Sequence, residues 1–424
     1  MQAQEFDYIV VDGVLLLEAG VDPIDNPAAK TFPSLFSLLE SDLDWTYPTT
    51  PQLNTNNRPH TVHSGKAHGL MGYRGLLPYF CRSEAFFDCK ADGREHGFEG
   101  SVRVTYPLRE PLKDAWAEVG EQFNPAPGTG QLSGVVEFLE TGQGGEPQAA
   151  YQAYSLDGVT VITGATAHKV EFHGPRKKAR KEVILAAGAL RTPQLLMLSG
   201  VGPPETLAIH GIPPVVECPE VGKNLIDHFA LYQLWKLRDP ERGLALGSPK
   251  LVHPALSTLG LPVDWAVNQQ IPRSVLDPAV QKDKRRFGSD TDESVLISGR
   301  PLVETITLYL PIGLPADGSL ITTSTMLLAA TSSGTNCAYT WCSPHAKAMP
   351  DTAAMGTYIE CEVPPLGMSS LTSQSSDEDF DARIRATGSA HHHPSGTVAI
   401  GKVVDADLRV FGVRNLRVEQ DVAG

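Results

Sequence analysis

EVILAAGALRTPQLLMLSGVG, residues 182–202, carries the clearest structural signal in the chain. It opens with Val183–Ala187, a short apolar run of the kind expected of a strand buried on both faces. Gly188, set among alanines, lets a backbone or a flat ligand approach closely. Thr192 is suited to cap a helix in which Pro193 is the first residue. A strand, a close-approach turn and a helix in this order build nucleotide sites in α/β proteins.

The same stretch resembles a family signature. Residues 188–202 are similar, at every restricted position, to the second signature of the GMC (glucose-methanol-choline) flavin oxidoreductases. VGKNLIDH, Val221–His228, resembles that family's VGxNLxDH segment. His393–Thr397, HPSGT, and Val404–Val418 resemble its closing block. These blocks cover the ends and the middle of the chain, and residues 229–384 match weakly.

The resemblance implies an α/β FAD-binding (Rossmann-like) domain that is discontinuous in sequence, with an α+β substrate domain built on an antiparallel sheet. Alternating runs at Thr305–Leu310 and Ser319–Leu328 favour that antiparallel sheet. Val159–Thr163 and Ala167–Phe172 read as a further strand pair. The expected FAD-binding domain comprises residues 1–75, 159–228 and 385–424, and the substrate domain with its connecting segments comprises residues 76–158 and 229–384.

Composition sets outer limits on function. The 424 residues are 41% hydrophobic and 20% charged, which is ordinary for a globular protein. A formal charge of −14 disfavours a general nucleic-acid or anionic-membrane binder, whose footprint is basic. No apolar run approaches the roughly 18 residues of a membrane helix, and the start shows no signal-peptide pattern. We expect a cytoplasmic protein whose partner is a small-molecule alcohol, with no nucleic-acid or membrane partner.

The cysteines give no sign of a disulfide framework or a zinc site, because they are scattered without a CxxC pair. Most are expected to be buried small apolar residues. The six are Cys81, Cys89, Cys218, Cys337, Cys342 and Cys361.

The N-terminus departs from the family pattern. Phe6–Val11 and Val14–Leu17 are apolar runs, and by resemblance Glu18 is the acid that binds the adenosine ribose. Only Asp12-Gly13 stands between the runs, whereas the phosphate-binding glycine loop and its helix need about 20 residues before the acid. Asp-Gly between apolar runs indicates a hairpin, and a parallel crossover requires about a dozen residues. We therefore predict a hairpin or one continuous strand.

A second segment is missing from the first family signature, because Leu70–Gly75 follows Gly65–Gly69 directly. By resemblance, the missing turn lies beside the isoalloxazine ring. The flavin pyrophosphate would also lose the helix N-terminus that normally faces it. We therefore expect FAD to be the cofactor but to bind with impaired affinity, through Glu18, the Ala167 backbone and Gly188.

The histidine run His391–His393 is the chemical candidate. Consecutive residues of a strand alternate faces, so the run is a poor metal cage and no metal site is expected. By resemblance, His393 is the catalytic base presented to the flavin N5. An imidazole, with an ordinary pKa of about 6.5, suits removal of a hydroxyl proton at neutral pH. The family's second His or Asn would lie beyond Gly424, so His393 is expected to act without it.

Three functions stay open from the sequence. The first is FAD-dependent oxidation of an alcohol, in fungal secondary metabolism as the PSGT variant suggests. The second is a non-redox cyclase or dehydratase on the same scaffold. The third is a remnant that binds flavin weakly or not at all and does not turn over.

Overall fold

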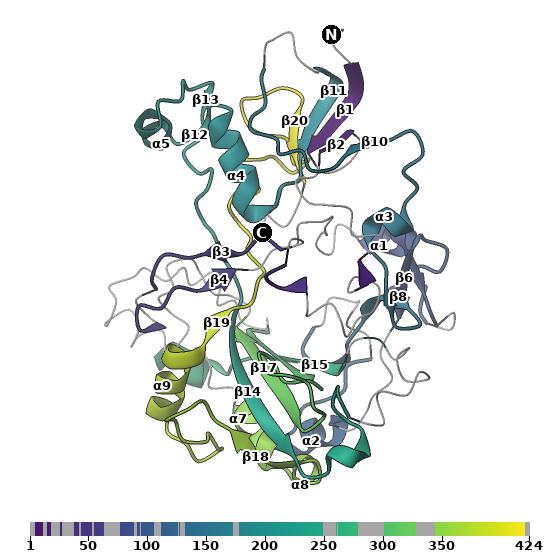
Figure 1. The fold of residues 1–424 in the computed structure, drawn as a ribbon, viewed down its shortest axis with the longest axis vertical. Helices are drawn as coiled ribbons and strands as arrows, with labels where there is room; N and C mark the ends of the chain where they lie inside the picture. Colours follow the sequence, from purple (N-terminus) through teal and green to yellow (C-terminus); the bar gives the residue numbers. More distant parts are fainter. Residues whose placement is uncertain are drawn as a thin grey trace.

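The structure is a computed structural model. It describes residues 5–11, 15–17, 26–27, 38–41, 44–52, 55–62, 77–88, 91–93, 95–105, 112–125, 127, 132–172, 178–248, 260, 262–278, 301–327 and 344–419. Two large sheets dominate these residues, a parallel one in the upper part of Figure 1 and an antiparallel one in the lower part. The chain passes between the two parts several times, so both are assembled from distant segments.

The parallel sheet has the strand order β10-β2-β1-β11-β20. Its strands are β1 (Glu5–Val11), β2 (Leu15–Leu17), β10 (Thr160–Ile162), β11 (Lys178–Leu185) and β20 (Leu416–Val418). β11 lies between β1 and β20 and pairs with both in parallel, so the apolar run that begins at Val183 enters a sheet as predicted. Strands from the beginning, middle and end of the chain thus form one discontinuous α/β unit.

The pairing of β1 with β2 contradicts the sequence prediction. The two strands are parallel, with Val10 opposite Leu16, so the predicted hairpin or continuous strand at Asp12-Gly13 is wrong. Asp12 and Gly13 themselves lie outside the described residues. The chain-length argument assumed strands that overlap along their whole length, but only the end of β1 faces β2. With Val10 opposite Leu16, the end of β1 at Val11 and the start of β2 at Leu15 are about 7 Å apart along the strand and about 5 Å apart sideways. Four peptide steps separate these two residues and can span about 13 Å, so the short link is long enough.

The helix after β11 starts earlier than the sequence indicated. α4 (Gly188–Leu198) begins directly after the strand, so Pro193 lies inside it and Thr192 does not cap it. Gly188 has a φ of 74°, which glycine adopts without steric cost and which lets the chain turn at once into the helix. The Thr192 hydroxyl instead accepts a hydrogen bond from the Ala187 N–H at 3.1 Å.

The segment that follows β10 also differs from its prediction. Residues 165–171 are not a strand, and β10 pairs with β2 rather than with them. Ala167 and Phe172 instead pack, partly buried, against the apolar cluster of the α/β unit, which includes Leu185 and Val398. Apolar side chains at alternating positions thus bury one side of an extended loop.

The antiparallel sheet has the order β18-β14-β17-β16-β15-β7, with β19 paired to β14. All of the described strand pairs in this sheet are antiparallel. Its strands are β7 (Gly134–Glu137), β14 (Phe229–Leu237), β15 (Val263–Gln269), β16 (Val303–Leu308), β17 (Leu320–Leu327), β18 (Ile359–Val363) and β19 (Ser389–Ala390). The two runs predicted from alternation correspond to β16 and β17, which lie side by side.

The two faces of this sheet are covered differently. Trp235 and Leu237 pack with Trp116 of α2 (Lys113–Glu118) and Met355 of α8 (Ala353–Gly356). On the other face, Tyr232 packs against an apolar cluster formed by the sheet itself and its loops. Helices α2 and α8, at the bottom of Figure 1, therefore cover one face, whereas Tyr232 on the other face contacts His391.

Smaller elements complete the described fold. The remaining strands are β3 (Tyr47–Pro48), β4 (Thr61–Val62), β5 (Glu84–Phe86), β6 (Val102–Thr105), β8 (Glu140–Gln143), β9 (Glu146–Pro147), β12 (Val201–Gly202) and β13 (Val216–Glu217). The remaining helices are α1 (Leu77–Ser83), α3 (Ala150–Ala153), α5 (Pro204–Ile209), α7 (Pro344–Ala348) and α9 (Asp377–Thr387), with 3₁₀ turns η6 (Pro240–Arg242) and η9 (Met349–Asp351).

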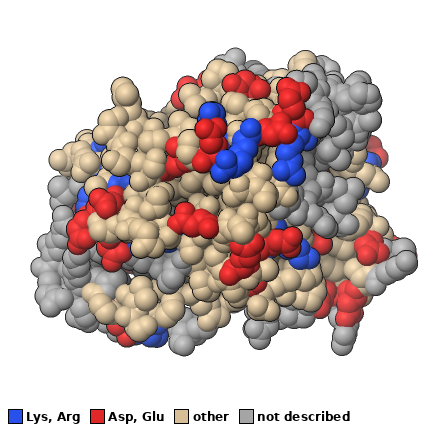
Figure 2. Space-filling view, turned by 90° about the horizontal axis from the view of Figure 1, so that it is seen from below, with Lys and Arg blue, Asp and Glu red and all other residues tan. Residues whose placement is uncertain are grey.

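Surface and membrane features follow from the same description. Seen from below, acidic groups are scattered among fewer basic ones, and no continuous basic patch covers this face (Figure 2). No helix in the described ranges is long and apolar enough to cross a membrane.

Of the three described cysteines, all of them free thiols, only Cys218 is buried, whereas Cys81 is partly exposed and Cys361 exposed, so the expectation of mostly buried cysteines does not hold for them.

Candidate functional site

The histidine segment joins the two sheets. After β19 the chain turns upward and reaches the parallel sheet, so residues 391–397 lie where the two parts meet (Figure 1). Its backbone is pinned to the segment that precedes β14. The His391 N–H donates to the His228 carbonyl at 2.9 Å, and Ser395 and Ile226 exchange both backbone hydrogen bonds. The two sequence blocks DH and HPSGT, far apart in the chain, are thus neighbours in space.

His393 is the exposed member of the run, and it is held at two points. Its backbone N–H donates to Asp227 Oδ1 at 2.8 Å. Its ring Nδ1 lies 3.1 Å from Nδ1 of His228, and the two rings are nearly perpendicular, at 89°. The other two histidines of the run are partly buried, so His393 is the most accessible of the three.

The ring of His391 contacts a different residue from the ring of His393. Its Nδ1 lies 2.7 Å from the Tyr232 hydroxyl, across 159 residues of sequence. Burial lowers the pKa of His391 to about 3, and it raises the pKa of Tyr232 to about 12. Both groups are therefore neutral around pH 7, and their contact ties the histidine segment to the antiparallel sheet.

Burial also shifts the two groups that touch His393. It lowers the pKa of His228 to about 4, with a further contribution from the neighbouring His393. It raises the pKa of Asp227 to about 6, although backbone N–H groups of His393 and His228 oppose that rise. At neutral pH His228 is uncharged and Asp227 is mainly ionised, so the carboxylate is a good acceptor for the His393 N–H.

The end of the HPSGT block is fastened to α4. Pro193 has no N–H, so the Ala189 carbonyl four residues earlier lacks its helical donor. The Thr397 hydroxyl donates to that carbonyl at 2.6 Å, in a fully buried position. Gly396 makes the approach possible, because at its φ of 86° a Cβ atom would stand 2.3 Å from the Asn224 carbonyl oxygen.

The predicted cofactor residues are only partly placed. Gly188 opens α4 at the end of β11, and Ala167 packs beside the same apolar cluster. Glu18 lies outside the described residues. The structure therefore brings Gly188, Ala167 and the HPSGT block to one core, since Ala189 and Val398 belong to it.

Several site residues were not singled out from the sequence. Asp227 and His228 end a block that had been recognised, and their charge and position before a strand could have identified them. Tyr232 and Thr397 gave no such signal, because their partners lie far away in the chain.

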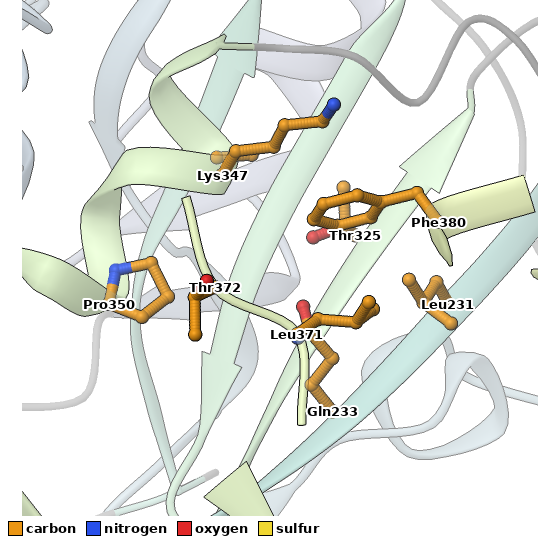
Figure 3. Close-up of a pocket in the computed structure, with 9 residues that line it drawn as sticks. Leu231, Gln233, Thr325, Lys347, Pro350, Leu371, Thr372 and Phe380 are labelled. Carbon is orange, nitrogen blue, oxygen red and sulfur yellow. The ribbon is translucent and has the colours of Figure 1, made fainter. Parts of the chain in front are cut away.

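One pocket lies away from this site. Leu231 and Gln233 line it (Figure 3), and because successive strand residues alternate faces, they lie on the face of β14 opposite to Tyr232. Lys347 at its rim forms an ion pair with Asp377 at 2.8 Å and lies over the Phe380 ring. The pocket thus belongs to the helix-covered face of the sheet.

The described residues suit the two ends of an FAD molecule better than its pyrophosphate. At the end where the resemblance places the base, His393 is exposed and its backbone N–H is held by Asp227. At the adenosine end, a parallel sheet and the strand-to-helix turn at Gly188 are present. Between them, three residues separate β1 from β2, which is too few for the helix that would face the pyrophosphate.

Comparison with known proteins identifies relatives of the whole arrangement. Residues 152–230 and 338–419 match the N- and C-terminal domains of the GMC oxidoreductases. The GMC-type oxidoreductase acuG of Aspergillus aculeatus is 34% identical over 390 residues, which cover 82% of this chain and 72% of that protein. Choline oxidase of Arthrobacter globiformis is 30% identical over 302 residues, and the match spans 53% of this chain and 55% of the enzyme.

A solved structure agrees at the level of fold. The crystal structure of a formate oxidase superposes with a TM-score of 0.80 at 20% identity, covering 100% of this chain and 94% of that one. The α/β FAD-binding fold expected from the sequence is thereby confirmed in its general form.

Proposed function

The chain belongs to the GMC oxidoreductases, which are FAD-dependent enzymes, and we propose that it oxidises an alcohol with His393 as the base. The observation that carries this proposal is the position of His393. It is exposed at the junction of the two sheets, and Asp227 holds its backbone there. A base on a fixed backbone can meet a hydroxyl proton in a constant geometry.

In the proposed reaction the alcohol carbon becomes a carbonyl carbon. The O–H bond breaks and the proton passes to Nε2 of His393, while the C–H bond breaks and its electron pair leaves with the hydrogen. FAD, when bound, supplies the acceptor for that hydride. The antiparallel sheet would bind the rest of the alcohol, and we assign residues 76–158 and 229–384 to this substrate domain. Residues 1–75, 159–228 and 385–424 would form the FAD-binding domain.

We propose Glu18, the Ala167 backbone and Gly188 as the cofactor contacts. Gly188 is supported by its place at the carboxyl end of a parallel strand, where α/β sheets bind nucleotides. A role in fungal secondary metabolism is the finer proposal, supported by the fungal source of the relative with 34% identity.

A second candidate is a chain that binds flavin poorly. The short link between β1 and β2 favours it, because the pyrophosphate would lack its helix N-terminus. An absorbance spectrum of the purified full chain separates the candidates. Colour that an alcohol bleaches supports the proposed oxidation, and colour that none of a panel of alcohols bleaches supports a non-redox reaction. A colourless protein that shows no bound-flavin absorbance after incubation with excess FAD and removal of the unbound FAD contradicts the proposed oxidation.

A further inference from the structure

We propose that His228 is a positioning residue that sets the ring tautomer of His393. The inference rests on the proposed role of His393 as the base, and it adds a group that the resemblance did not assign. The orienting partner would come from the DH block before β14.

The argument begins with the contact between the two rings. The Nδ1 atoms of His228 and His393 are 3.1 Å apart, which is a hydrogen-bond distance. When both rings are neutral, one Nδ1 carries the hydrogen and the other accepts it. Two arrangements are therefore conceivable, and they leave opposite states at Nε2 of His393.

Only one of the two arrangements is compatible with a base. If His393 donates from Nδ1, its Nε2 carries no hydrogen and can take a proton without disturbing the contact. If His228 donates, Nε2 of His393 already carries hydrogen, and protonation at Nδ1 would break the hydrogen bond. Because burial lowers the pKa of His228 to about 4, His228 stays neutral and can remain the acceptor when His393 becomes cationic.

The surrounding groups are engaged in ways that leave this pairing intact. Asp227 accepts from the backbone N–H of His393 rather than from its ring. His391 Nδ1 contacts the Tyr232 hydroxyl, and His392 continues the chain with a φ of 64°, its ring stacked near that of His391. The His391 ring also packs edge-on against the His393 ring, with centroids 5.1 Å apart, while its Nδ1 stays with the Tyr232 hydroxyl.

A matched pair of variants tests the proposal. His228→Asn keeps an acceptor, because the amide Oδ1 can occupy the place of Nδ1, whereas His228→Leu removes it. The full chain, labelled with ¹⁵N in its histidine rings, is examined by NMR at about pH 8, where His393→Ala identifies the His393 signals. His210→Asn, on the exposed end of α5, is the control for labelling and folding.

We expect Nδ1 of His393 to be protonated in the parent chain and in His228→Asn, and Nε2 to become protonated in His228→Leu. In protein that turns over, kcat should fall by about 10–100-fold in His228→Leu and recover in His228→Asn, as for other residues that orient a functional histidine. A parent chain with Nε2–H on His393, or a tautomer unchanged in His228→Leu, overturns the inference. The NMR result needs neither flavin nor turnover, so the expected tautomer in a chain that oxidises no alcohol would leave this inference standing and defeat only the proposed function.

Discussion

The two ends of the proposed site differ in how many contacts hold them together. At the histidine end, six backbone or side-chain hydrogen bonds join residues 391–395 to the segment before β14 and to Tyr232. At the nucleotide end, one register pair joins β1 to β2, and three residues connect them. The proposed base and the proposed cofactor contacts thus lie in separable parts of this fold.

This difference has a direct chemical meaning. A base can be fully formed while the cofactor beside it is weakly held, because the two rely on different hydrogen bonds. Each of the following experiments perturbs one end and asks whether the other responds.

The largest effect is expected from removing the base. If the chain binds FAD, His393→Ala should lower kcat by about 10²–10⁴-fold, since general base catalysis typically contributes that much. Flavin content should stay unchanged, because the substitution leaves the nucleotide end intact. Stopped-flow bleaching and the absorbance of bound flavin give the two quantities, with His210→Ala as the control. Retained turnover would transfer the role to His391 or His392, or to no histidine.

Cofactor affinity is expected to be weakened by roughly two to four powers of ten, with about 1.4 kcal/mol for each tenfold. The reason is the loss of two or more charge-assisted hydrogen bonds to the pyrophosphate, each worth about 1.5–3 kcal/mol. The chain should purify colourless, and FAD should bind little more tightly than adenosine in equilibrium dialysis. A yellow protein with stoichiometric flavin would refute this expectation.

The contact between Thr397 and Ala189 should affect stability by about 1–3 kcal/mol, the cost of a buried carbonyl left without a donor. Thr397→Val removes the donor. Pro193→Ala in the same chain restores the helical N–H to Ala189, so the double variant should recover part of the loss. Urea unfolding measures each free energy, and strictly additive effects would contradict the coupling.

Thr357→Val is the matched control for that pair. Its hydroxyl donates to the Ala354 carbonyl at 2.8 Å in an exposed position, where water can replace it. We expect this substitution to change the free energy of unfolding by less than about 0.5 kcal/mol.

A last expected effect is a pH dependence of stability. The pKa values of His228 and His391, about 4 and about 3, lie below the ordinary 6.5, so the unfolded chain binds more protons and these groups make stability rise with pH up to about 6.5. Asp227 opposes them, because its pKa of about 6 lies above the ordinary 3.8 and the folded chain holds its proton longer. Asp227→Asn should therefore make the rise steeper between about pH 4.5 and 6 in urea unfolding. A flatter profile would contradict the shift assigned to Asp227.

The sequence alone predicted strands correctly where local pattern and spacing determine the structure. The run at Val183 and the alternating runs of β16 and β17 entered sheets because their apolar periodicity leaves few alternatives. Motif resemblance also identified the two blocks that meet around His393. Pairing between strands is a different kind of information, because it depends on how far two strands overlap.

The wrong or missing predictions concern strand overlap, backbone conformation and long-range contacts, which local sequence patterns do not determine. A short link excludes a full parallel crossover but not the single pair Val10–Leu16. The start of α4 was misplaced because Gly188 allows a left-handed turn before a helix, whereas Pro193 suggested a later beginning. Tyr232 was missed because its role depends on a partner that only the tertiary structure brings near.

The order of strands in the parallel sheet also bears on how the chain is made. β11 acquires its second neighbour only after Leu416–Val418 of β20 have been made. Until then the nascent chain exposes one edge of β11, with backbone groups free to pair with another chain. Polypeptides that stop between β11 and β20 are therefore expected to aggregate more readily than chains in which β20 covers Val183–Leu185 of that edge.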